Sequence, residues 1–240
     1  MGWWIFGAFC LWFFFQLRKG FKRLDEAKRR GDMVSYSAGS VAKNWMLALA
    51  HPMAYHSMRG GFAESHLNSV DDTLAKDLRP MILHHLGMRT DLSDDSIRQQ
   101  LPDQFRQKWF SLDLLKLHRS DQPRAAMAFA CARVAFFVRS AFLMGWIDDA
   151  TQWQLLQLNG LRTQECFNSW QDYGEAYAQG RAQWVAQGRS DILGTPFTPE
   201  QVAEWVNAPQ HPWHVLEWDT ALQEVSDSES HRTMTAPLAG

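Results

Sequence analysis

The sequence has few of the features that mark small cross-linked or low-complexity proteins. Only three of its 240 residues are cysteines, and they are widely spaced, at Cys10, Cys131 and Cys166. Cysteines so spaced build neither a disulfide framework nor a cysteine-ligated zinc site, and they fit a reducing compartment. Fifteen glycines and nine prolines exclude a collagen-like chain, and a hydrophobic fraction of 46% excludes wholesale disorder.

A strong net charge is also missing. The chain has 24 Lys and Arg against 26 Asp and Glu, a formal net charge of −2. Nucleic-acid-binding domains are usually strongly basic, so we expect no nucleic-acid partner. The near-balance conceals an uneven distribution. Residues 1–30 hold seven basic and two acidic side chains (net +5), which leaves 17 and 24 (net −7) for residues 31–240.

What the sequence does have is an uncharged apolar run at its N-terminus, GWWIFGAFCLWFFF at residues 2–15. A helix over residues 1–17 would be roughly 25 Å long, with Trp3, Trp4 and Trp12 available as interfacial anchors. A cleaved signal peptide would need a basic region before the run and a small-residue cleavage site after it, and neither is present. We predict a membrane anchor; the alternative is a hydrophobic helix docked on protein.

A basic segment follows the apolar run, beginning with Arg18, Lys19, Lys22 and Arg23. By the positive-inside rule this places the N-terminus outside and the rest of the chain in the cytoplasm. The same side chains can contact anionic lipid headgroups. We therefore divide the chain into an anchor (1–17), a basic juxtamembrane linker (18–37), a helical domain (38–222) and a disordered tail (223–240).

Beyond the linker the hydrophobic pattern has the period of helices, and strand-like alternation is almost absent. We predict an all-α fold. Caps are expected at Ser93 or Asp94, at Asp148, at Ser169 and at Thr198. The expected helices cover residues 40–58 with an interruption at Pro52, 71–86 with a break at Pro80, 91–101, 102–117, 123–146, 148–167, 169–187 and 198–206.

The run over residues 125–146 is long and apolar enough to raise the question of a second membrane span. Arg133 and Arg139 lie near its middle, and each would cost about 2.5–3.5 kcal/mol on an insertion scale. We therefore predict the central core helix of a water-soluble domain.

Arg133 is the most informative residue of that helix, because it sits between Phe129 and Phe137 and should be at least partly buried. A buried guanidinium must be paired. One interpretation is a core salt bridge that fixes helix register, and the other is an anion-binding or catalytic arginine. The carboxylates that follow in the sequence, and that we consider as partners, are Glu165, Asp172 and Glu175.

The helix from residue 169 has an aromatic stripe that ends in a basic residue. Its members are Trp170, Tyr173, Tyr177, Arg181 and Trp184, spaced 3, 4, 4 and 3, so they share one face. Gly174 and Gly180 lie beside them, and glycine inside a helix suggests close approach of another helix or a ligand. The stripe is either helix–helix core or a surface that binds a flat or anionic ligand.

The nine histidines show no metal-ligand spacing, and there is no glycine-rich phosphate loop or nucleophile elbow. We expect neither a metal site nor a cofactor.

Residues 126–184 and the end of the domain carry a set of positions typical of one family. They are Arg133, Gly145-Trp146-Ile147, Asp149, Phe167, Ser169-Trp170, Tyr173, Tyr177, Gly180-Arg181, Trp184, the pair Pro212-Trp213 and a closing Trp218. In these positions the chain resembles the bacterial domain-of-unknown-function 1266 family, and the resemblance extends over residues 40–218.

The sequence departs from that pattern just before Arg133. The family often has a Trp-Asp pair there, and this chain has Phe129 and Ala130. The resemblance implies a compact helical domain of bacteria and, through members that accompany secreted-toxin or chaperone-like loci, a protein-binding role. It implies no activity.

Two functional hypotheses follow. The first is a protein-interaction module anchored in the bacterial inner membrane and facing the cytoplasm, for example an immunity or accessory protein for a secreted toxin or a secretion system. This hypothesis predicts a stripe that is partly exposed. The second is an enzyme that acts on an anionic small molecule. Its arginines Arg133 and Arg181 would neutralise the substrate, and Asp172, Glu165 or Tyr177 would complete the site.

Overall fold

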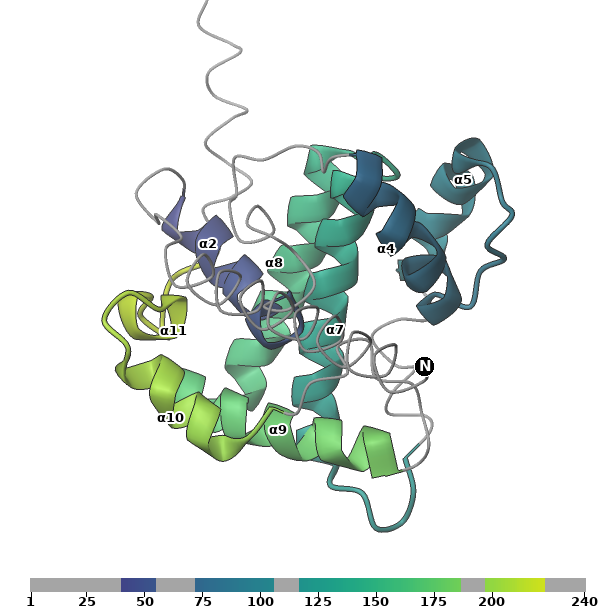
Figure 1. The fold of residues 1–240 in the computed structure, drawn as a ribbon. Helices are drawn as coiled ribbons and strands as arrows, with labels where there is room; N and C mark the ends of the chain where they lie inside the picture. Colours follow the sequence, from purple (N-terminus) through teal and green to yellow (C-terminus); the bar gives the residue numbers. More distant parts are fainter. Residues whose placement is uncertain (1–39, 55–71, 106–116, 187–196, 223–240) are drawn as a thin grey trace, which may run out of the picture.

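The computed structural model describes residues 40–54, 72–105, 117–186 and 197–222, and the regular elements in them are helices (Figure 1). The all-α prediction is confirmed for this part of the chain. The predicted anchor with Trp3, Trp4 and Trp12, the basic linker and the tail lie outside the described residues. The helices are α2 (Val41–Ala48), α3 (His51–Ala54), α4 (Asp72–His85), α5 (Asp94–Gln104), α7 (Pro123–Leu143), α8 (Asp149–Cys166), α9 (Trp170–Ala186), α10 (Pro199–Asn207) and α11 (Pro212–Val215).

Helix α7 is the centre of the fold. It packs against α8 and α9 and also contacts α2 and α3. Nearly all of its side chains are buried, which explains why its sequence has no polar face. Among the described helices α7 is the one long and apolar enough to span a bilayer, and 94% of its most apolar window is buried inside the fold. That burial fits the predicted core helix.

Local chemistry sets the ends of the helices around α7. The Asp148 carboxylate accepts a hydrogen bond from the Thr151 N–H (2.7 Å) and opens α8, and the Ser169 hydroxyl accepts from the Asp172 N–H (3.1 Å) and opens α9. Both caps are confirmed. Helix α7 ends at Leu143, and Gly145 follows in the next turn with a φ of +69°, the left-handed conformation that favours glycine.

The structure confirms one of three predicted helix interruptions at proline. The interruption near Pro52 is confirmed, as a turn between α2 and α3. The break at Pro80 is wrong, because α4 runs through it. The boundary at Pro102 is also wrong, because α5 continues to Gln104. A proline inside a helix removes one N–H, and at Pro80 the carbonyl that loses its partner is that of Lys76, an exposed residue.

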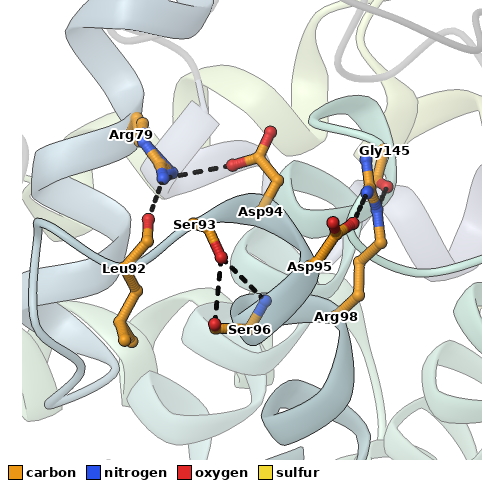
Figure 2. A network of polar contacts seen from close by, with 8 residues as sticks. All are labelled: Arg79, Leu92, Ser93, Asp94, Asp95, Ser96, Arg98 and Gly145. Carbon is orange, nitrogen blue, oxygen red and sulfur yellow. Dashed lines mark hydrogen bonds and ion pairs between the residues drawn. The ribbon is translucent and has the colours of Figure 1, made fainter.

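Polar contacts join α4, α5 and the turn after α7 (Figure 2). Arg79 of α4 donates to the Leu92 carbonyl and pairs with Asp94 (3.1 Å). Arg98 of α5 pairs with Asp95 (2.7 Å) and donates to the Gly145 carbonyl (3.0 Å). We call this region the α4–α5 corner; its remaining members are Ser93, which caps α5, and Ser96.

Candidate functional site

The aromatic stripe of α9 faces the interior. Trp170, Tyr173 and Tyr177 are at most 4% exposed, and Trp184 is half-buried. The Trp170 ring stacks on Trp213 of α11, with 5.5 Å between centroids and 14° between planes. The expectation of a partly exposed stripe therefore holds for Trp184 alone among its aromatic members, and the first three rings build the core.

The buried rings also satisfy backbone carbonyls at helix ends. The Trp213 indole donates to the Ala48 carbonyl (3.0 Å), and the Tyr173 hydroxyl donates to the Leu49 carbonyl (2.8 Å). In a continuous helix the N–H of residue 52 would bond to Ala48, but Pro52 has none. The indole of Trp213 thus replaces the donor that Pro52 lacks.

Two further indoles do the same at other helix ends. Trp170 donates to the Leu216 carbonyl (2.7 Å) just after α11, and Trp218 donates to the Phe167 carbonyl (3.1 Å) just after α8. Burial raises the pKa of the Tyr173 phenol well above its usual value, so this residue stays a neutral donor. We call this region the aromatic corner, and its members are Trp45, Trp170, Tyr173, Trp205, Trp213 and Trp218.

Both glycines beside the stripe lie at close contacts, as predicted. A Cβ on Gly180 would lie 2.1 Å from the Ala125 carbonyl oxygen of α7. A Cβ on Gly174 would lie 2.6 Å from the Trp213 ring and 2.8 Å from Val202. The backbone of α9 therefore approaches α7 on one side and α10 and α11 on the other. Of the two alternatives, another helix or a ligand, it is other helices that lie against these glycines.

Arg133 is buried, with 7% exposure, at the far end of the stripe. Its guanidinium carbon lies 4.6 Å from the centroid of the Trp184 ring and about 6 Å from those of Phe129 and Phe137 (6.0 and 5.8 Å). Aromatic faces attract such a cation. Arg181, also on α9, is 8% exposed.

The carboxylates predicted as partners of Arg133 lie elsewhere. Asp172 forms its ion pair with Arg124 at the start of α7, and this contact lowers the pKa of its carboxyl. Glu165 and Glu175 are exposed. Asp172 and Arg181 are nine residues apart on α9, about 13 Å along the axis. Asp172 therefore does not join Arg181 in one small site.

Sequence reasoning missed a polar chain between α7 and α8 that runs from buried Arg139 to exposed Asp149. Arg139 is fully buried, and its guanidinium donates to the Gln152 amide oxygen (2.9 Å). Burial lowers its pKa to about 10, opposed by the charge of Asp149. Asp149 in turn accepts from the Gln152 amide (3.3 Å) and the Trp153 indole (2.8 Å). The sequence did hold a signal for this chain. Asp149, Gln152 and Trp153 are spaced to share one face of α8, and Arg139 is a second arginine in the apolar run of α7.

Sequence reasoning also missed a pair of buried histidines. His51 opens α3 and His211 caps α11, so they are 160 positions apart, and their ring centroids lie 4.6 Å apart. Trp205 of α10 stacks on His211 (4.5 Å, 24°). Neither histidine has a neighbour in the sequence at the spacing of metal ligands. Within the described residues, no group of three or more His, Cys, Asp or Glu is placed to hold a metal ion.

One known protein family matches most of the chain. The profile described as "Protein of unknown function (DUF1266)" matches residues 43–218, most of the chain. The chain belongs to this family. No match was found among curated proteins or among solved structures.

The positions that carried the DUF1266 resemblance have structural tasks here. Trp170, Tyr173, Trp213 and Trp218 form much of the aromatic corner and donate to helix-end carbonyls. At the departure from the family pattern, Phe129 packs on Tyr177 and Trp184, and Ala130 is buried.

Proposed function

We propose that this DUF1266 protein is a protein-interaction module, anchored in the bacterial inner membrane and facing the cytoplasm. Its most specific form is an immunity or accessory protein for a secreted toxin or a secretion system. The observation that supports this is the excess of exposed carboxylates over the C-terminal helices. Across residues 148–186 and 197–222, every exposed Asp, Glu, Lys or Arg side chain is a carboxylate. They are Asp148, Asp149, Glu165, Glu175, Glu200, Glu204, Glu217 and Asp219.

These carboxylates extend over several helices. Glu200 and Glu204 are one turn apart on α10, which packs against α9, where Glu175 is exposed. At the end of α8, the Gln164 amide donates to the carbonyls of Trp218 and Thr220, both at 2.9 Å. This places Glu165 close to the segment that holds Glu217 and Asp219. The surface is therefore broad enough for a protein.

The charge also suggests the kind of partner and the orientation. An acidic surface is repelled by anionic lipid headgroups, whereas the basic linker 18–37 is attracted to them. The domain would then hold its acidic surface away from the bilayer, where it steers a partner with a basic surface into contact. The partner is thus a basic protein, and the lipid contact belongs to the N-terminus.

A purification with matched charge variants tests the partner. The full-length chain, tagged at its C-terminus and extracted in mild detergent, should copurify with a stoichiometric protein. Glu200→Lys with Glu204→Lys should abolish that copurification. Asp72→Lys with Asp77→Lys, on exposed positions of α4, should leave it unchanged. Recovery of the chain alone, or equal loss with both double variants, would contradict the proposal.

Fractionation tests the anchor separately. The full-length chain should sediment with membranes and resist alkaline carbonate, because an apolar helix in the bilayer is held by the hydrophobic effect. A chain of residues 31–240 should be recovered folded in the soluble fraction. An insoluble 31–240 chain would instead indicate that the N-terminal helix is part of the core.

A further inference from the structure

The two buried histidines join parts of the chain that are distant in sequence. His51 is 4% exposed and belongs to α3, close to the N-terminal side of the domain, and His211 is 2% exposed and caps α11. The His51 ring stands edge-on to both His211 and Trp205, at 4.6 and 5.1 Å between centroids. The three rings therefore hold the α10–α11 unit (residues 199–215) against α3.

The hydrogen bonding of His211 requires a neutral ring. Its Nδ1 accepts from the Trp213 N–H (3.1 Å) and so caps α11. An acceptor nitrogen carries no proton, so in the neutral ring the proton is on Nε2. Nε2 of His211 is buried and has no hydrogen-bond acceptor. A second proton, on Nδ1, would turn the cap acceptor into a donor that faces the donor of Trp213.

No described carboxylate offsets a positive charge at this place. Burial lowers the pKa of His51 to about 4. Burial and the neighbouring His51 lower that of His211 still further. The charged and titratable groups on the surrounding helices are Lys43 of α2, Arg124, Cys131, Arg133 and Arg139 of α7, Asp172, Tyr173, Glu175, Tyr177 and Arg181 of α9, Glu200 and Glu204 of α10, and His214 of α11. Asp172 pairs with Arg124, and Glu175 is exposed. Glu200, Glu204 and His214 are exposed, and Lys43 lies over the Trp153 ring.

We propose that the His51–His211 pair is an acid-operated latch, in which protonation of the two imidazoles releases the α10–α11 unit from α3. The proton that His211 takes from solvent breaks the bond between Trp213 N–H and His211 Nδ1. With a proton on His51 as well, two like charges lie within one buried site. Release exposes Trp205 and Trp213 and separates α10 and α11 from α9 and α2, while α7, α8 and α9 keep their contacts with one another.

The size of the effect follows from proton linkage. In the released state the pKa of each histidine returns to its ordinary value of 6.5. In the closed state both pKa values are lower, so release takes up protons. The closed state is fully favoured above about pH 6.5 and loses stability as pH falls below it. With one proton per ring, the opening equilibrium rises about thirtyfold per histidine, or about a thousandfold for both, between pH 7.5 and pH 5.

Hydrogen exchange read by mass spectrometry tests the latch in the full-length chain in detergent. Between pH 7.5 and pH 5, after correction for intrinsic exchange rates, protection over residues 199–216 should fall by up to a thousandfold. Protection over α8 should be retained. His211→Asn keeps a capping acceptor without a titrating ring, so its loss should shrink to about thirtyfold. His51→Gln gives an independent second test with the same expectation.

The control is His214→Asn, because His214 is exposed on the same short helix and bonds to the Val206 carbonyl (2.8 Å). It should keep the full pH dependence. Three results would overturn the latch: protection over 199–216 that does not change with pH, equal loss over α8 and 199–216, or an unchanged slope in both His211→Asn and His51→Gln.

Discussion

The aromatic corner and the α4–α5 corner are built on opposite principles, and they lie on opposite sides of α7 (Figure 1). In the aromatic corner, buried indoles and a phenol donate to carbonyls at the ends of α2, α8 and α11. In the α4–α5 corner, partly or largely exposed arginines pair with aspartates and donate to carbonyls (Figure 2). Both corners satisfy backbone carbonyls where helices end. The aromatic corner does so with buried donors, and the α4–α5 corner does so with donors that water can reach.

The difference predicts where stability is concentrated. A buried donor that is removed leaves a carbonyl that water cannot reach, which costs about 1–3 kcal/mol, in addition to the lost packing. An exposed ion pair contributes about 0–1 kcal/mol, because water competes with it and salt screens it. Substitutions in the two corners should therefore differ severalfold in their effect on the free energy of unfolding.

The largest effect is expected for Trp213→Ala. The ring stacks on Trp170, fills the space over Gly174 and donates to Ala48. Its loss should lower the free energy of unfolding by about 3–5 kcal/mol in a urea titration of the full-length chain in detergent. Val215→Ala, two residues on and 47% exposed, should change it by less than about 0.5 kcal/mol. Equal effects would show that the aromatic corner does not stabilise the fold.

Gly180→Ala should follow, with a loss of about 1–3 kcal/mol, because the added Cβ meets the backbone of α7 rather than a side chain that can turn away. Gly87→Ala is the matched control. Its surroundings are open, but its φ is +67°, so the cost of about 1 kcal/mol is conformational. Asn tolerates that conformation, so Gly87→Asn should recover part of the loss, and Gly180→Asn should not. Recovery at both positions would contradict the close approach.

Tyr173→Phe isolates a single buried hydrogen bond. It keeps the ring and removes the hydroxyl that donates to Leu49, so the expected loss in thermal or urea unfolding is about 1–2 kcal/mol. Thr220→Ala removes a hydroxyl that donates to the Glu217 carbonyl in an exposed place, where water replaces it. Its expected loss is below about 0.5 kcal/mol. A Tyr173→Phe loss no greater than that of Thr220→Ala would remove the distinction between a dry and a wet helix end.

What the sequence predicts well here is local. The caps at Asp148 and Ser169 depend on residues three positions apart, and the central position of α7 follows from apolar residues all round the helix. The contacts at Gly174 and Gly180 were predicted from the cost of glycine in a helix. The partner of each glycine was not, because it lies on another helix.

What the sequence does not predict is long-range pairing. Trp213 and Ala48 are 165 positions apart, and His51 and His211 are 160 apart. Pattern reasoning paired Arg133 with a carboxylate on a following helix, but Asp172 meets Arg124 instead. A period of 3.6 residues assigns a residue to a face, and only the packing angle of two helices decides which side chains meet across it.

Arg98→Ala should have the smallest effect and tests the α4–α5 corner directly. It removes the pair with Asp95, whose side chains are 48% and 85% exposed, and the bond to the Gly145 carbonyl. We expect a loss within about 1 kcal/mol that shrinks further in high salt, since the pair is screened. The measurement is urea unfolding at low and high ionic strength. A loss as large as that of Trp213→Ala and independent of salt would mean that Arg98 holds α5 on the end of α7 as firmly as the indoles hold α2 and α11, and the contrast between the two corners would fail.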